Sequence, residues 1–168
     1  MEHAERTIGE GAKIARATRA LRSPSLTHEH VTRPGGIVAA YVWDYADGMT
    51  MLRRFWDAVT AVHPSAVAMD EARRFPLCQP AALADVWRAS GLDAVEGCAF
   101  EVATPCRDFD DYWAPFLSGQ GPAPSYVASL TAPERERLRE QLRSTLSTAP
   151  SGAIELTARA WGVRGARA

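Results

Sequence analysis

The chain has 168 residues, of which 46% are hydrophobic and 23% are charged, and its 19 basic residues nearly balance its 20 acidic ones. Such a composition is typical of one soluble globular domain that buries a core without disulfides or metal ions. The net charge of -1 lacks the basic surplus that binds phosphate backbones or anionic lipid. The sequence therefore predicts neither a nucleic-acid partner nor a membrane partner.

Segment hydropathy and cysteine usage indicate the compartment. No stretch approaches the ~20 apolar residues of a membrane span, and residues 1–23 lack the apolar core of a secretory signal. The cysteines Cys78, Cys98 and Cys106 are odd in number and form no C-x-x-C pair, which favours reduced thiols over a disulfide framework or a zinc site. We therefore expect a cytoplasmic protein. Lys13 is the only lysine in the chain, a bias typical of GC-rich bacterial genes.

Three segments have strand patterns. Residues 36–43 form a continuous apolar run, which predicts a strand covered on both faces. Residues 93–103 alternate loosely between apolar and polar side chains, which predicts a second strand with a bulge near Gly97. Residues 153–163 alternate with period two, which predicts a half-buried strand before a frayed tail that begins at Arg164.

Helical patterns separate these strands. Apolar residues at helical spacing predict helices over 49–63, 80–91 and 109–116. A further helix is predicted over 131–146, because Thr131 and Glu134 form a capping box. The alternation of strands and helices predicts an α/β layer fold, which residues 1–30 fit least well.

Several short motifs have simple structural explanations beside their functional ones. Gly9-Glu10-Gly11 is similar to a nucleotide-binding glycine loop, but no strand pattern precedes it. His28 and His30 lie in one loop and supply at most two metal ligands, so no metal site is predicted. His63 stands at a helix end, where an imidazole commonly meets the terminal carbonyl groups.

Acidic residues open the helix predicted after Asp108. Asp108, Asp110 and Asp111 fit acid/base chemistry, but their spacing is also what helix capping and dipole compensation require. Nucleophilic hydrolysis has no support, because the sequence contains no G-x-S-x-G motif and no recognisable cysteine–histidine arrangement.

Trp43-Asp44-Tyr45 is the more informative segment. It follows the strand predicted over 36–43, and ligands of open α/β sheets bind beyond the carboxyl ends of parallel strands. A carboxylate between two aromatic residues there could line a pocket. The alternative is that Trp43 is a core residue and Asp44 begins a turn, and the sequence supports both interpretations equally.

The segment Thr32-Arg33-Pro34-Gly35-Gly36-Ile37-Val38-Ala39-Ala40-Tyr41-Val42-Trp43-Asp44-Tyr45 resembles the fifth strand, with its Arg-Pro-Gly-Gly lead-in, of class I S-adenosylmethionine-dependent methyltransferases of the small-molecule, type 11 kind. The similarity covers residues 31–165 and leaves 1–30 as a poorly matched segment and 166–168 as a tail. It implies the C-terminal half of a Rossmann-like α/β fold. That half contains the last three strands, with the C-terminal strand antiparallel and central, and a helical insertion.

The resemblance also implies an activity, the transfer of a methyl group from S-adenosylmethionine to a small-molecule acceptor. Trp43, Asp44, Tyr45 and Trp113 are expected to line the acceptor side. No cofactor-binding residue or catalytic base is assigned, because the family's cofactor motifs belong to its first four strands. We therefore expect an N-terminally shortened homologue that does not bind the cofactor alone. The alternatives are a non-catalytic α/β interaction or ligand-binding module, or a misassigned gene start.

The same resemblance bears on association. In the family sheet a fourth strand flanks the strand at 36–43, and residues 1–30 lack the apolar, β-branched character to replace it. An edge strand without charge or proline is one that natural proteins normally cover. We therefore predict self-association through residues 36–43, or dependence on a partner chain.

Overall fold

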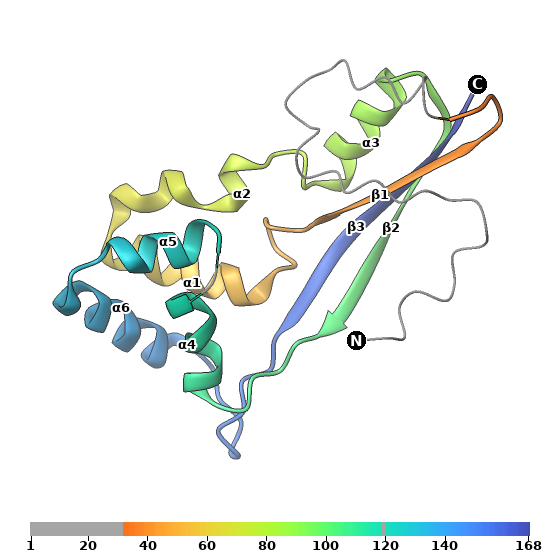
Figure 1. The fold of residues 1–168 in the computed structure, drawn as a ribbon. Coiled ribbons are helices and arrows are strands. Elements are labelled where there is room, and N and C mark those ends of the chain that lie inside the picture. The colour runs from red at the N-terminus through yellow and green to blue at the C-terminus, as the bar shows by residue number, and fades with distance from the viewer. Residues whose placement is uncertain (1–31, 119) are drawn as a thin grey trace. The chain divides into compact units, whose positions relative to one another are not determined.

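The computed structural model describes residues 32–118 and 120–168 (Figure 1). The predictions for the glycine loop at 9–11 and for the histidines at 28 and 30 lie outside these residues. The described elements follow one another as β1 (Ile37–Trp43), α1 (Thr50–Val62), the 3-10 helix η3 (Pro64–Met69), α2 (Glu71–Arg74), α3 (Pro80–Ala89), β2 (Leu92–Ala103), α4 (Phe109–Ser118), α5 (Pro122–Ser129), α6 (Ala132–Thr145) and β3 (Thr157–Arg167).

The three strands form one sheet in the order β1-β3-β2, so the C-terminal strand is central (Figure 1). Backbone hydrogen bonds join the start of β1 to the end of β3, where the Arg167 amide donates to the Gly36 carbonyl at 2.9 Å. On the other side of β3, just after the end of β2 and just before the start of β3, the Thr104 amide donates to the Leu156 carbonyl at 2.8 Å. Both neighbours therefore run antiparallel to β3. This order and the α/β class confirm the predicted arrangement of strands.

The C-terminal strand extends further than its alternation predicts. Residues 164–167 belong to β3, so the prediction of a frayed tail from Arg164 is wrong. The physical reason is pairing with the lead-in to β1, because the Gly35 amide also donates to the Arg167 carbonyl and the Arg167 guanidinium donates to the Thr32 carbonyl. At the other end, Ile154 forms only an isolated antiparallel bridge before β3 begins.

The irregularity in β2 lies at Ala94 rather than at Gly97. Ala94 has a positive φ of 48°, which is uncommon for a residue with a side chain. Leu92 and Val95 are three positions apart, yet both lie beside Gly165 of β3. Since side chains alternate between faces in a regular strand, this arrangement requires one extra residue between them.

One face of β1 is open, which corrects the prediction of a strand covered on both faces. Val38 and Val42 are buried, whereas Ile37 is 58% exposed and Tyr41 is 45% exposed. These residues alternate along the strand, so the exposed pair shares one face and the buried pair the other. A run that is apolar at every position cannot show which face is covered.

The chain divides into two compact units. The first contains residues up to Val42, Gln79–Phe100 and Ala160–Ala168, and the second contains Trp43–Cys78 and Glu101–Arg159. In the first unit, Leu83 and Trp87 are the buried face of α3. Pro80 occupies its first turn and Gly91, with a φ of 75°, follows its end. Both positions agree with the predicted boundaries of this helix.

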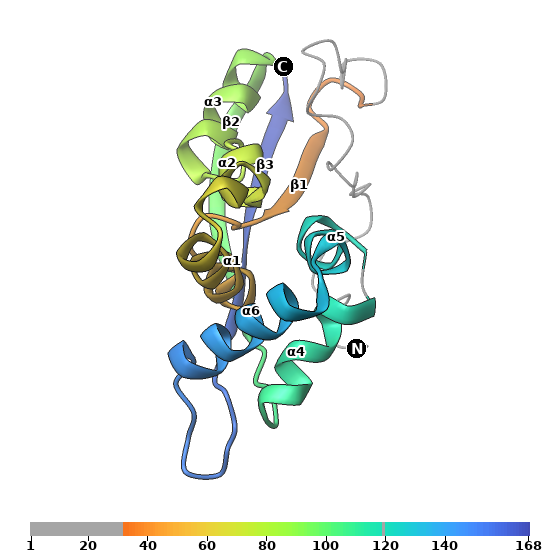
Figure 2. The ribbon, with the colours of Figure 1, turned by 90° about the vertical axis from the view of Figure 1, so that its left-hand side faces the viewer.

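The second unit has an aromatic core between its helices, and Figure 2 shows α1 beside α6 and α4 beside α5. The Phe55 ring stacks on Phe116 at 4.4 Å and meets Trp56 edge-on at 5.1 Å. Tyr112 is fully buried, and its hydroxyl donates to the Met51 carbonyl at 3.0 Å. Aromatic pairs in such geometries stabilise a core beyond the burial of their area.

Two helices of this unit, α4 and α6, begin at side-chain caps that the sequence predicts. Thr131 and Glu134 form the capping box of α6. Before α4, the Asp111 amide donates to the Asp108 carboxylate at 2.8 Å. Asp110 and Asp111 pair with Arg139 and Arg107, respectively. The three carboxylates at this helix start therefore act as a cap and as surface ion pairs. Within the described part of the chain, no helix is both long and apolar enough to cross a membrane.

Candidate functional site

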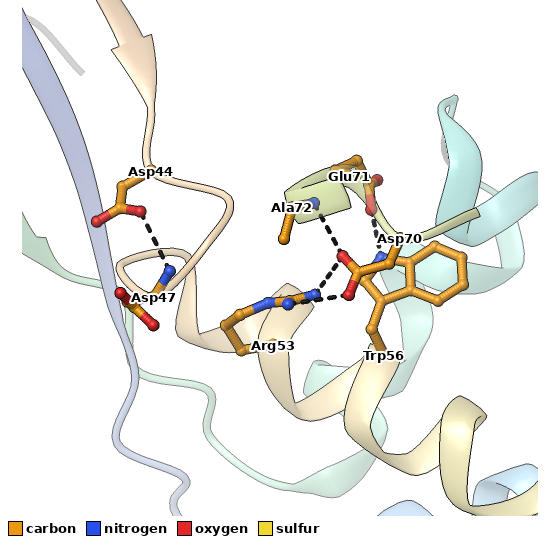
Figure 3. A network of polar contacts seen from close by, with 7 residues as sticks. All are labelled: Asp44, Asp47, Arg53, Trp56, Asp70, Glu71 and Ala72. Carbon is orange, nitrogen blue, oxygen red and sulfur yellow. Dashed lines mark hydrogen bonds and ion pairs between the residues drawn. The ribbon is translucent and has the colours of Figure 1, made fainter. Parts of the chain in front are cut away.

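The turn that follows β1 is organised by Asp44, which is only 2% exposed. Its carboxylate accepts a hydrogen bond from the Asp47 amide at 3.1 Å, and its carbonyl accepts one from the Met49 amide at 2.9 Å (Figure 3). Asp44 therefore begins a turn, as the alternative interpretation of this segment predicts. The other part of that interpretation is wrong, because Trp43 is 40% exposed and is not a core residue. The turn places α1 directly after the strand.

The second oxygen of the Asp44 carboxylate binds Arg159 of β3. The Arg159 Nε and Nη2 atoms lie 2.8 Å and 2.7 Å from Asp44 Oδ2. Gly48 makes room for this pair, because a Cβ atom there would lie 2.4 Å from Arg159 Cβ and 2.9 Å from Asp44 Oδ2. Both oxygens of the buried carboxylate are thus satisfied inside the protein.

Tyr45 lies against the segment that precedes α3. Its half-buried ring is 5.7 Å from that of Phe75. Burial raises the pKa of the Tyr45 hydroxyl, and the nearby Cys78 and Glu71 raise it further. Burial, with a smaller effect of Asp44, raises the pKa of the Cys78 thiol to about 11. Because the thiolate is the reactive form, Cys78 is not an activated nucleophile at neutral pH.

A second pair of buried carboxylates lies beside α1, at Asp70 and Glu71 (Figure 3). Two nitrogens of the Arg53 guanidinium donate to Asp70 at 3.0 Å and 2.5 Å. Asp70 also caps α2, because its Oδ1 accepts a hydrogen bond from the Ala72 amide at 2.9 Å. Glu71 accepts a hydrogen bond from Trp56 Nε1. Together with Asp44, these are the buried charged residues of the described chain.

The predictions from sequence did not include Asp70 or Glu71. The sequence does contain a signal for this short helix. An aspartate and a glutamate that precede two arginines give the order of charges expected of a short helix with an N-cap. What the pattern could not show is burial. A helix of four residues has little apolar surface of its own, so the sequence does not indicate that its first residues face Trp56 and Arg53.

Burial is the largest cause of the raised pKa of Glu71, while its own backbone hydrogen bond, the Trp56 indole and the Arg53 charge oppose it. A raised pKa in the folded state means that the fold binds the proton more tightly than the unfolded chain does. The stability that this proton contributes is complete below the usual pKa near 4.5 and is lost as the pH rises through the folded value.

We expect Glu71→Gln to become more stable relative to the wild type as the pH rises between about pH 5 and pH 8. Glutamine keeps an oxygen that can accept the Trp56 hydrogen bond but carries no buried charge. Urea denaturation of both proteins across this range gives the difference in the free energy of unfolding. Asp85→Asn removes a carboxylate that is 75% exposed and is the matched control. An equal slope for both variants would contradict the assignment to Glu71.

The other two aromatic candidates occupy different surroundings. Trp43 ends β1 and is 40% exposed. Trp113 is 5% exposed in the core of the second unit, with its ring 5.9 Å from that of Phe116. The structure therefore brings Asp44 and Tyr45 together with Glu71 and Cys78, whereas Trp113 supports α4.

His63 does not cap carbonyl groups with its ring, which corrects its sequence interpretation. Its Nδ1 lies 2.6 Å from the hydroxyl oxygen of Tyr126 in α5. Tyr126 is almost fully buried, so this bond satisfies a polar group at the edge of the core. Over residues 32–118 and 120–168, no three histidine, cysteine or acidic side chains are placed to hold a metal ion.

Taken together, the turn after β1 can position groups but contains no activated nucleophile. The buried Asp44 is paired with Arg159, Asp70 is paired with Arg53, and the exposed aromatic Trp43 stands next to the fixed turn. Comparisons with known proteins add no assignment: no protein-family model matches the chain, and no curated protein is significantly similar to it.

Proposed function

We propose that this chain is a methyltransferase homologue, the C-terminal, acceptor-side half of a class I S-adenosylmethionine-dependent fold that acts on a small molecule. The observation that carries the proposal is the sheet order β1-β3-β2, in which the last strand lies antiparallel between the two earlier ones. A helical segment, α4 to α6, separates β2 from β3. The resemblance at residues 32–45 implies both features.

In this proposal the turn after β1 forms part of the acceptor side. Trp43 and Tyr45 supply aromatic surface beside the carboxyl end of the strand, and Asp44 holds the turn through Arg159. Trp113 contributes indirectly, by packing against Phe116 in the helical core. Such enzymes rely on orientation and on exclusion of water more than on acid/base catalysis, which agrees with a site built from aromatic residues and a fixed turn.

In this proposal the chain alone does not hold the methyl donor, because the family's cofactor motifs belong to its first four strands. Asp44 is the carboxylate that directly follows β1, and both its oxygens bind within the protein, so it is not available to hold ribose hydroxyl groups. No residue of this chain is therefore assigned to the methyl donor. We expect that it does not bind S-adenosylmethionine at micromolar concentration.

The test compares the chain with a longer version that includes the coding sequence directly upstream in the genome. We expect that upstream sequence to encode an apolar strand followed by G-x-G-x-G, and the longer protein to bind S-adenosylmethionine in calorimetry while the chain does not. Saturable micromolar binding by the chain alone would contradict the missing cofactor site. An upstream sequence without that motif would contradict the methyltransferase proposal.

A non-catalytic interaction module is the second candidate. The observation that favours it is the open face of the sheet, where Ile37 and Phe100 are each 58% exposed. Monomeric soluble proteins rarely expose large contiguous apolar patches, and such patches commonly mark contacts with other molecules.

A further inference from the structure

One face of the sheet in the first unit is apolar and open. Ile37 and Phe100 are the most exposed large apolar side chains on it. A depression of about 420 Å³ lies between the strands on this side. We call this surface the open face, and it consists of Ile37, Ala39, Tyr41, Cys98, Phe100 and Gly162.

The centre of the open face is Gly162 of β3, which the side chains of β2 cover. A Cβ atom on Gly162 would lie 2.5 Å from the Phe100 ring and 3.3 Å from Cys98 Sγ. These side chains therefore lie across the glycine, as aromatic residues do when they cover a glycine on a neighbouring strand. The result is a broad, low surface rather than a deep pocket, because Phe100 is still 58% exposed.

The charges beside this face form a balanced pair. Arg164 Nη2 lies 2.6 Å from Glu96 Oε2, and both side chains are 61% exposed. One acidic and one basic group give the patch no net charge, and the whole chain carries only -1. A net charge near zero favours association of like molecules. In a two-fold interface, a contact between Arg164 of one copy and Glu96 of the other occurs twice, because the symmetry repeats it with the two copies exchanged.

We propose that the open face binds a second copy of this chain, face to face. A shallow, apolar surface with a self-complementary ion pair at its margin has the character of a contact between identical subunits. The proposal differs from the predicted self-association through the edge of the strand at residues 36–43, because it assigns the contact to the side chains of β1 and β2 instead of to the backbone edge of β1. It stands independently of methyl transfer.

Cys98 is a natural reporter of this contact, because it is exposed on the open face. Cys78 is buried, and burial raises the pKa of both Cys78 and Cys106. We expect light scattering with size exclusion to show a dimer that forms between micromolar and several hundred micromolar chain. Over that range, the rate of maleimide labelling at Cys98 should fall about tenfold as the dimer becomes dominant. Cys98→Ser identifies labelling at the other two thiols.

Phe100→Glu should return the chain to a monomer and make Cys98 labelling independent of concentration. The matched control is Ala99→Glu, an exposed neighbour on the opposite face of the same strand, which should still dimerise. Because Phe100 also covers Gly162, its replacement lowers stability as well, so Ile37→Glu tests the same face from β1. Thermal unfolding confirms that each variant is folded.

Three results would overturn the proposal. The first is a monomer at every concentration, and the second is a dimer that survives both Phe100→Glu and Ile37→Glu. The third is slow labelling of Cys98 where the chain is still monomeric, which would mean that the face is covered within one chain. None of these results bears on the upstream coding sequence or on cofactor binding, so they leave the proposed function to its own test.

Discussion

Asp44→Ala should lower the free energy of unfolding by about 3–5 kcal/mol, because it removes one partner of a buried ion pair. The Asp44 side chain is 3% exposed. Its removal leaves the Arg159 guanidinium, which is 28% exposed, without its closest acceptor. The same substitution removes the acceptor of the Asp47 amide, so the turn between β1 and α1 also loses one of its internal hydrogen bonds. Urea denaturation followed by circular dichroism measures the change.

A surface pair of similar geometry is the control for this prediction. The ion pair between Arg164 and Glu96 is as short as that between Arg159 and Asp44, but both of its side chains are 61% exposed. At concentrations where the chain is monomeric, Arg164→Ala should therefore change stability by about 1 kcal/mol or less. Equal losses for Asp44→Ala and Arg164→Ala would contradict the importance of burial. A double-mutant cycle with Arg159→Met separates the coupling of the pair from the cost of each substitution.

Trp56→Ala should be similarly severe, with a loss of about 3–5 kcal/mol, because it opens a large cavity in the helical core. Trp56 is 1% exposed, and its ring packs against those of Phe55 and Tyr126. Its indole N–H is also a hydrogen-bond donor to the buried Glu71 carboxylate. Removing the donor leaves that carboxylate with one partner fewer, which adds to the cavity cost.

The loss of stability in Trp56→Ala has two causes, the cavity and the lost hydrogen bond, and Trp56→Phe separates them. Trp56→Phe keeps much of the ring volume and removes the indole donor, so it should cost less than Trp56→Ala and should cost still less in a Glu71→Gln background. Leu117→Ala is the exposed control, since Leu117 is 56% exposed on α4 and its truncation should change stability little. Chemical denaturation of the wild type, the two Trp56 variants, Glu71→Gln, the double variant and Leu117→Ala provides the comparison. An effect of Trp56→Phe that is the same in both backgrounds would contradict the role of the hydrogen bond to Glu71.

The helices and strands that the sequence predicts correctly have one property in common. The sequence pattern that indicates each of them lies within the element itself or directly beside it. The capping box at Thr131 and Glu134, the proline at the start of α3 and the apolar run of β1 depend on neighbours within a few residues. The order of the sheet is a different case. It came from the resemblance at residues 32–45 rather than from periodicity, and the observed order β1-β3-β2 agrees with it.

At the candidate site, the sequence predicts a turn but not the partners of the residues in it. Sequence alone singled out Trp43-Asp44-Tyr45 as the segment after a strand, and the turn there is real. Whether Asp44 faces a ligand or a protein partner depends on Arg159, which is 115 residues away along the chain. The partners of Glu71 and Tyr45 are likewise set by how the segment before α3 packs on α1, and no local pattern encodes that contact.

By itself, the sequence of this protein determined where most helices and strands begin, through caps, prolines and hydrophobic periods that act over one or two turns of chain. The tertiary structure alone decided which face of β1 is open, how far β3 extends and which carboxylates are buried. Ile37 and Val38 are both apolar, yet one is 58% exposed and the other 7%. Burial depends on which distant segments pack on a given face, and the free energy of that packing is a property of the whole fold rather than of any one segment.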